Sequence, residues 1–130
     1  MEYARRYFKE VRAIAEQIDL AVIEKMVAQI EAAKAAHGRM FFLGVGGSAA
    51  NCTHAVNDFR KIGGMECYSP VDNVAEITAR TNDEGCHTVF APWLKCSHLS
   101  SRDIVFILSV GGGNREKNIS VNLIEALDFA

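Results

Sequence analysis

Two glycine-rich segments carry the strongest chemical signal in the sequence. They are Gly44-Val45-Gly46-Gly47-Ser48 and Ser109-Val110-Gly111-Gly112-Gly113, and each follows a short apolar run and precedes a segment of helical character. Glycine lets a backbone approach a ligand closely, and the N-terminus of a helix attracts negative charge, so such loops can hold a phosphate group. The alternative is that the glycines only make tight turns between a strand and a helix. Because both loops are expected at one edge of a sheet, we favour anion binding.

His54 and Asp58 form a second candidate site. They are four residues apart in a segment expected to be helical, so their side chains share one face and can converge on one point. An imidazole and a carboxylate in this relation can bind a metal ion, and the carboxylate can also act as a base. From the spacing alone, a partly buried histidine beside a surface aspartate is the simpler interpretation.

A third polar group is Asn82-Asp83-Glu84-Gly85, which we expect to be a turn between short helices at about 72–81 and 88–96. Asn, Asp and Gly favour turns for local reasons, so the turn by itself does not indicate a ligand. The four cysteines, at positions 52, 67, 86 and 96, contain no Cys-x-x-Cys pair. The sequence therefore signals neither a zinc ribbon nor a redox dithiol, and Cys52 and Cys67 are interpreted as small apolar residues.

Helices are expected before the first strand. Apolar residues recur at steps of three and four over the first 37 residues, Asp19 can cap a second helix, and Gly38 is the expected helix stop. These observations predict two helices, nearly continuous with each other, at the N-terminus.

Strands and helices alternate after Gly38. Short apolar runs at 39–43 and 104–108 predict buried strands, with a further strand at 65–68. Helices are expected at about 49–62 and from about 119 to the end. Strand, glycine-rich turn and helix thus occur twice, which is typical of an α/β domain with a mainly parallel sheet. Ligands of such domains bind beyond the C-terminal ends of the strands, where both glycine-rich loops fall.

Composition limits the classes of partner. The chain has 130 residues, of which 49% are apolar, and its 14 Lys and Arg against 16 Asp and Glu give a net charge of −2. A protein that binds a nucleic-acid backbone is normally basic, so nucleic acid is not an expected partner. No apolar run approaches the ~20 residues of a membrane helix, and the N-terminus lacks a signal-peptide core. We expect a cytoplasmic, globular protein.

Nucleotide binding is an alternative function for a glycine-rich loop. Gly44-x-Gly46-x-x-Ala49 formally fits the dinucleotide fingerprint, but the acidic residue expected at the end of the second strand is missing there. No Gly-Lys-Ser/Thr follows a glycine-rich loop, so a P-loop is not supported.

Taken together, the first glycine-rich loop, the His54-x-x-x-Asp58 helix, Asn82-Asp83-x-Gly85 and Ser109 resemble the SIS (sugar isomerase) domain family. Within that family the chain looks most like the phosphoheptose isomerases, over essentially its whole length. The resemblance implies a Rossmann-like, three-layer α/β fold. Residues 1–37 would then be the N-terminal helices that help to form a homotetramer, and residues 38–130 the SIS domain.

The resemblance also implies a reaction and a set of roles. Phosphoheptose isomerases convert sedoheptulose 7-phosphate to D-glycero-D-manno-heptose 7-phosphate through an enediol, which needs a base, a group that polarises the carbonyl, and a phosphate anchor. His54 would be a zinc ligand, Asp58 a ligand or the base, and Asn82 and Asp83 would reach the sugar hydroxyls or the reacting carbons. The residues expected to bind the substrate through its phosphate are Gly46, Gly47, Ser48, Ser109, Gly111, Gly112 and Ser120.

The sequence departs from the family pattern in four places. Val45 replaces an asparagine, Asp58 replaces a glutamate, and residues 114–118 form a polar insertion in which Arg115 or Lys117 can add charge. The chain also stops in its third strand–helix unit, where the family continues with further strands and the remaining zinc ligand, so we expect a C-terminally incomplete domain with an exposed sheet edge. A non-catalytic SIS module that binds sugar phosphates to regulate or to scaffold is the second hypothesis. Val45 and the altered loop favour this module, whereas His54 with Asp58 favours the enzyme.

Overall fold

A computed structural model describes residues 1–130 and divides them into two compact units, Met1–Ala32 and Ala33–Ala130. Helix α1 spans Glu2–Gln17, and α2 spans Leu20–Ala35 and continues into the second unit. The side chain of Asp19 accepts a hydrogen bond from the backbone N–H of Ala21 at 2.9 Å, which confirms the expected cap. No helix is long and apolar enough to span a bilayer.

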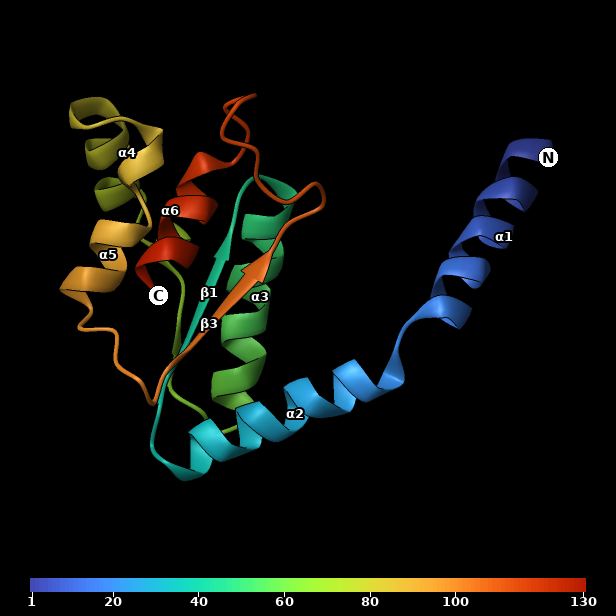
Figure 1. Cartoon of the computed structure of the whole chain (residues 1–130), viewed down its shortest axis with the longest axis horizontal. Coiled ribbons are helices and arrows are strands. Elements are labelled where there is room, and N and C mark those ends of the chain that lie inside the picture. Colours follow the sequence, from blue (N-terminus) through green and yellow to red (C-terminus); the bar gives the residue numbers. More distant parts are fainter. The chain divides into compact units, whose positions relative to one another are not determined.

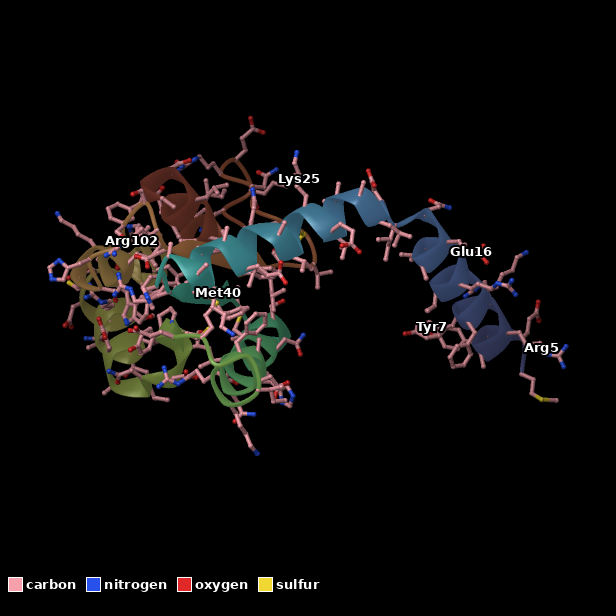
Figure 2. All side chains as sticks on the ribbon, turned by 90° about the horizontal axis from the view of Figure 1, so that it is seen from below. Arg5, Tyr7, Glu16, Lys25, Met40 and Arg102 are labelled. Atoms are coloured by element: carbon pink, nitrogen blue, oxygen red, sulfur yellow. The ribbon has the colours of Figure 1, made fainter.

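Helix α1 has no buried residue within its own unit. Figure 2 shows its side chains, among them Tyr7, standing away from the helix. The apolar residues that predicted the helix keep 44–73% of their surface exposed; they are Tyr3, Tyr7, Val11, Ile14 and Ile18. The first unit therefore presents an apolar stripe with no partner inside it.

The second unit is built on a parallel sheet with the strand order β2-β1-β3 (Figure 1). Strand β1 is Met40–Gly44, β2 is Cys67–Tyr68 and β3 is Ile104–Leu108. All five residues of β1 are buried, because this strand lies between the other two. The expected parallel α/β architecture is confirmed, and β3, paired on one side only, is an edge of the sheet.

Helices cover both faces of the sheet and make three layers (Figure 1). On one face, Phe42 of β1 lies with its ring centroid 5.2 Å from that of Phe59 in α3 (Gly47–Lys61) and 5.4 Å from that of Phe106 in β3. On the other face, Phe41 and Leu43 pack into a core with α5 (Ala91–Cys96) and α6 (Val121–Phe129). Alternate residues of β1 thus point to opposite layers, as the pleat requires.

The segment between β2 and α5 differs from its predicted form. It consists of a 3-10 turn η1 (Pro70–Asp72), helix α4 (Val74–Asp83) and a second 3-10 turn η2 (Cys86–Thr88). Asn82 and Asp83, expected in a turn, are the last two residues of α4. The helix runs this far because its stop is Gly85, with φ of 96°, whose N–H donates to the carbonyl of Arg80.

Gly38, predicted as the residue that stops the helix, has a different structural role. The residue in the left-handed conformation after α2 is His37, with φ of 54°. A Cβ atom at Gly38 would lie 1.9 Å from the carbonyl oxygen of Arg102, which precedes β3. Glycine is therefore needed here because two segments approach each other closely.

A buried ion pair joins the N-terminal ends of β1 and β3. Two side-chain nitrogens and the backbone N–H of Arg39 donate to the carboxylate of Asp103 at 2.8–3.1 Å, and the guanidinium also donates to the carbonyls of Ser97 and His98. Burial alone would raise the pKa of the Asp103 carboxyl, but the hydrogen bonds from Arg39 and Ser100 lower it well below its usual range. This contact fixes the two strands at the end of the sheet opposite to the glycine-rich loops.

Candidate functional site

The carboxyl ends of β1 and β3 meet at the point where their following helices diverge. Gly44 is the register partner of Leu108, yet α3 leaves to one face of the sheet and α6 packs on the other. In open α/β sheets, ligands bind at such a switch point. A cavity of about 200 Å³ lies here, lined by Val45, Ser48, Leu108, Ser109, Val110, Gly111, Gly112, Ile119, Ser120 and Leu123.

Five of the residues predicted to hold a phosphate line this one cavity. They are Ser48 from the first loop, Ser109, Gly111 and Gly112 from the second, and Ser120 at the start of α6. Of the other two, Gly46 lines an adjoining cavity and Gly47 is the first residue of α3. Two loops that are more than sixty residues apart in the sequence thus place three hydroxyl groups around one space.

Some glycines of these loops are required by their backbone conformation, and others are not. Gly46 and Gly112 have φ of 61° and 64°, a conformation that other residues rarely adopt. Gly47 and Gly111 have no positive φ, and a Cβ added at either would meet no atom within 4 Å. Neither turn geometry nor packing requires glycine at these two positions. The space that they leave is available to a ligand.

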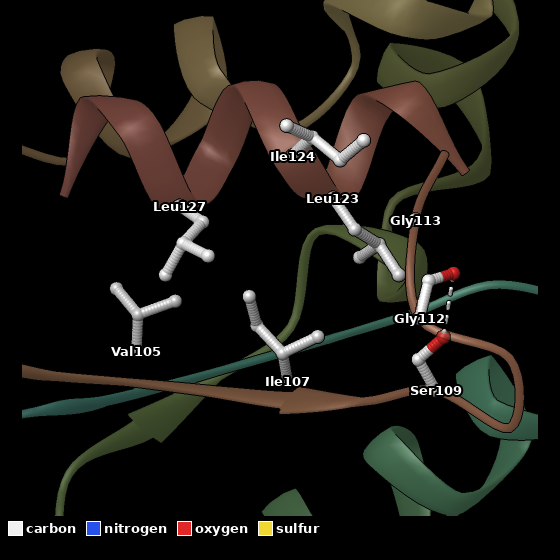
Figure 3. Close-up of a pocket in the computed structure, with 8 residues that line it drawn as sticks. All are labelled: Val105, Ile107, Ser109, Gly112, Gly113, Leu123, Ile124 and Leu127. Carbon is white, nitrogen blue, oxygen red and sulfur yellow. Dashed lines mark hydrogen bonds between the residues drawn. The ribbon is translucent and has the colours of Figure 1, made fainter. Parts of the chain in front are cut away.

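Two helix N-termini open towards the cavity. The cap residues of α3 and α6, Gly46 and Ser120, make no side-chain hydrogen bond to their helices, although Asn122 accepts from the N–H of Leu123 in the first turn of α6. Uncapped N–H groups and the dipoles of the two helices both favour a negative charge. The hydroxyl of Ser109 donates to the carbonyl of Gly112 at 3.3 Å and closes the second loop on itself (Figure 3). The arrangement can bind an anion with three oxygens, such as a phosphate group.

His54 and Asp58 converge as predicted. The Nε2 atom of His54 lies 3.3 Å from Oδ2 of Asp58, and their side chains are 77% and 45% exposed. A zinc site takes at least three protein ligands, and the chain holds no group of three His, Cys, Asp or Glu side chains placed for a metal. The pair supplies two donors of a type that zinc accepts, and the chain as described offers no third.

The pair does not share a cavity with the two glycine-rich loops. His54 and Asp58 are six and ten residues beyond Ser48 on α3, which puts them about 9 and 15 Å further along the helix axis. At about 100° per residue, His54 is turned about 240° around the helix from Ser48. Within one chain, therefore, α3 directs the serine and the His54–Asp58 pair to different sides.

Comparison with known proteins gives the fold a name. No family model matches the sequence, and no curated protein matches it. Among solved structures, phosphoheptose isomerase GmhA from Neisseria gonorrhoeae superposes with a TM-score of 0.82 at 23% identity, over 99% of this chain and 67% of the other. A phosphoheptose isomerase from Francisella tularensis gives 0.79 at 21% identity, over 99% and 67%. The fold is that of the phosphoheptose isomerases. The chain spans about two thirds of each neighbour's length.

Asn82 and Asp83 lie apart from the cavities at the switch point of this phosphoheptose isomerase fold. Both side chains are exposed at the end of α4, where the amide of Asn82 donates to the carboxylate of Asp83 at 2.8 Å. Neither residue lines a cavity, although Thr81, one residue earlier, does. Their expected contact with the sugar stays a prediction.

Several polar residues of the site were missed by the sequence interpretation. Cys86, His87, Asn118 and Asn122 line a second cavity of about 190 Å³, which shares Val45 and Ser120 with the first. The spacing of Asn118 and Asn122, two residues before and two after Ser120, is the one signal that could have drawn attention to them. Nothing in the sequence connects Cys86 or His87 with the second loop.

Two other hypotheses change with the structure. The guanidinium of Arg115 pairs with Glu125 and Asp128 of α6, so its charge is already engaged by these two carboxylates. The dinucleotide fingerprint lacks its acidic residue here too, because β2 is followed by Ser69, whose hydroxyl donates to the carbonyl of Phe42.

The cysteines behave as predicted. All four are free thiols, and Cys52 and Cys67 are buried. Burial raises the pKa of Cys52 to about 11, so this thiol stays protonated and is a core residue.

Proposed function

We propose that the protein is a sugar-phosphate isomerase that converts sedoheptulose 7-phosphate to D-glycero-D-manno-heptose 7-phosphate through an enediol. One observation carries the proposal: Ser48, Ser109 and Ser120 surround a single cavity at the switch point of a phosphoheptose isomerase fold. The phosphate would accept hydrogen bonds from the hydroxyls of Ser48 and Ser120 and from the N–H groups of the glycine-rich loops, and so hold the sugar in one orientation.

The chemistry requires a proton to move between two neighbouring carbons. A carboxylate takes a proton from C1 of the ketose as O2 gains one, which gives the enediol; C2 is then protonated as O1 loses a proton, which gives the aldose. Asp58 and Asp83 are the candidates for this base. We propose that His54 and Asp58 supply two ligands of a zinc ion, whose part would be to polarise the sugar oxygens.

A second candidate function is a non-catalytic module that binds a sugar phosphate. The separation of the His54–Asp58 pair from the phosphate cavity favours it, as does Val45, which puts an apolar side chain where the resemblance leads one to expect an asparagine. Such a module would keep the anion site and lack turnover.

Metal analysis of the full-length protein separates the two functions. For the enzyme, we expect stoichiometric zinc in the wild type and its loss in His54→Ala, because an imidazole contributes directly to zinc affinity. Asn51→Ala, an exposed change on the same helix that touches no cavity, is the matched control and should retain the metal. Zinc absent from the wild type as well as from His54→Ala would favour the binding module.

A further inference from the structure

The cavity beside the phosphate site has the composition of a hydroxyl-binding pocket. Its wall combines the amides of Asn118 and Asn122 with the imidazole of His87 and the hydroxyl of Ser120. Because Ser120 and Val45 belong to the walls of both cavities, a molecule whose phosphate lies against Ser120 can extend into this second space.

Asn122 is the least exposed polar residue of this wall, with 5% of its surface accessible. Its Oδ1 accepts from the N–H of Leu123 at 2.9 Å, and its Nδ2 has a single acceptor, the sulfur of Cys86 at 3.6 Å. An amide has two N–H donors and two acceptor lone pairs, and a thiol is a weak acceptor. Each polar atom of this buried amide therefore has one partner, and one N–H and one lone pair are left for a ligand or water.

Asn118 is held at the opening of the same cavity by the second loop. Asn114 and Ile119 pair with each other across the loop, and the N–H of Asn118 donates to the carbonyl of Arg115 at 3.2 Å. Its φ of 51° is in the left-handed region, which asparagine tolerates better than most residues. No hydrogen bond within the protein engages the side-chain amide of Asn118. The backbone contacts of the loop nevertheless hold the main chain from which this side chain extends.

We propose that Asn118 and Asn122 form the subsite that binds the hydroxyl groups of the phosphorylated sugar and that they determine its selection over a bare phosphate. The proposal rests on the proposed function, because it needs the phosphate to lie against Ser120. Amides suit the task, since each can donate to one hydroxyl and accept from another. Val45, on the boundary between the cavities, would contact the carbon side of the sugar chain.

The test is a calorimetric titration of the full-length protein with two probes, inorganic phosphate and sedoheptulose 7-phosphate. The wild type should bind the sugar phosphate more tightly than phosphate. In Asn122→Ala and Asn118→Gly, we expect the Kd for the sugar phosphate to rise about 10-fold, the usual effect of one lost hydrogen bond, with the Kd for inorganic phosphate little changed. Asn51→Ala again serves as the matched amide control, and should change neither Kd.

The outcomes separate the two proposals. The subsite is overturned if both variants keep the wild-type ratio of the two Kd values. This holds whether the two affinities are unchanged or fall by the same factor. Failure of the wild type to bind either probe contradicts the proposed function instead. If circular dichroism shows that Asn122→Ala is unfolded, Asn118→Gly decides the question, because glycine adopts the positive φ at this exposed position without strain.

Discussion

Gly47 is a glycine that neither the backbone conformation nor the packing of the fold requires. As the first residue of α3 it has no positive φ, and a Cβ there would meet no neighbouring atom. A side chain at this position would lie in open space, one residue before Ser48, which lines the cavity where we place the phosphate.

Gly47→Ala should therefore weaken phosphate binding without destabilising the protein. Alanine is favoured over glycine in a helix, so the free energy of unfolding should stay constant or rise by about 0.5 kcal/mol. Urea unfolding and calorimetry with inorganic phosphate measure the two effects. Gly113→Ala is the contrasting variant, because its Cβ would lie 2.4 Å from Ile124 and the protein should lose stability. Unchanged phosphate affinity in Gly47→Ala would show that the ligand does not approach this residue.

The sequence predicted single residues unevenly. It identified the serines and glycines of both loops, because strand, glycine-rich turn and helix form a local pattern that tertiary contacts preserve. It missed Asn118, Asn122 and His87, whose proximity depends on how η2 packs against α6. It also misplaced the role of Gly38, since the approach of Arg102 comes from a segment that is more than sixty residues away.

At the scale of elements, the two ends of strands β1 and β3 differ in their roles. The carboxyl ends carry the loops of the candidate site, while the amino ends are held by Arg39 and Asp103. The Asp103 side chain is 2% exposed and that of Arg39 is 24% exposed, so this pair is not a screened surface contact.

Asp103→Asn should destabilise the protein by about 3 kcal/mol, because it leaves the guanidinium partly buried without its counter-charge. The wild type should also lose stability in acid. The folded-state pKa of Asp103 lies below the unfolded value of 3.8, so its contribution is complete above the unfolded pKa and decreases as the pH falls below it. Urea unfolding at a series of pH values measures both effects. A similar acid dependence in Asp103→Asn would mean that other carboxyls cause the loss.

The elements were predicted well where one strong local signal decided them, as for β3, whose apolar run at 104–108 has the predicted bounds. Strand β2 is shorter than expected, with two residues, because only Cys67 and Tyr68 pair with β1. Helix α4 is longer at its C-terminal end, since Gly85 ends it and the polar residues before Gly85 do not interrupt it.

At the scale of the whole molecule, two apolar surfaces are left at least partly open. One is the stripe of α1. The other adjoins the edge strand β3, where Val105 and Ile107 face Leu123 and Leu127 of α6 across a cavity of about 360 Å³ (Figure 3). An unpaired apolar edge strand is a site for pairing or aggregation unless something covers it.

We propose, in line with the resemblance to phosphoheptose isomerases, that the protein is a homo-oligomer, and more specifically a homotetramer, that uses the stripe of α1. Light scattering of the full-length protein should give the mass of a tetramer. Replacing Tyr7 and Val11 with Glu should lower that mass, because charges in a packed apolar contact are costly to bury. The matched control is Arg12→Glu, which is exposed and pairs only with Glu16 on its own helix. A monodisperse monomer in the wild type would contradict the proposal.

The central claim, that the protein catalyses an aldose–ketose isomerisation, is tested most directly by nuclear magnetic resonance. The full-length protein is supplied with zinc and sedoheptulose 7-phosphate in D2O, and the sugar protons are followed over time. The proposed enediol route predicts that the aldose phosphate appears with deuterium at C2, because the base exchanges its proton with solvent before returning it. Ketose phosphate that binds, yet shows neither conversion nor exchange of its C1 protons, would contradict the enzyme and leave the binding module.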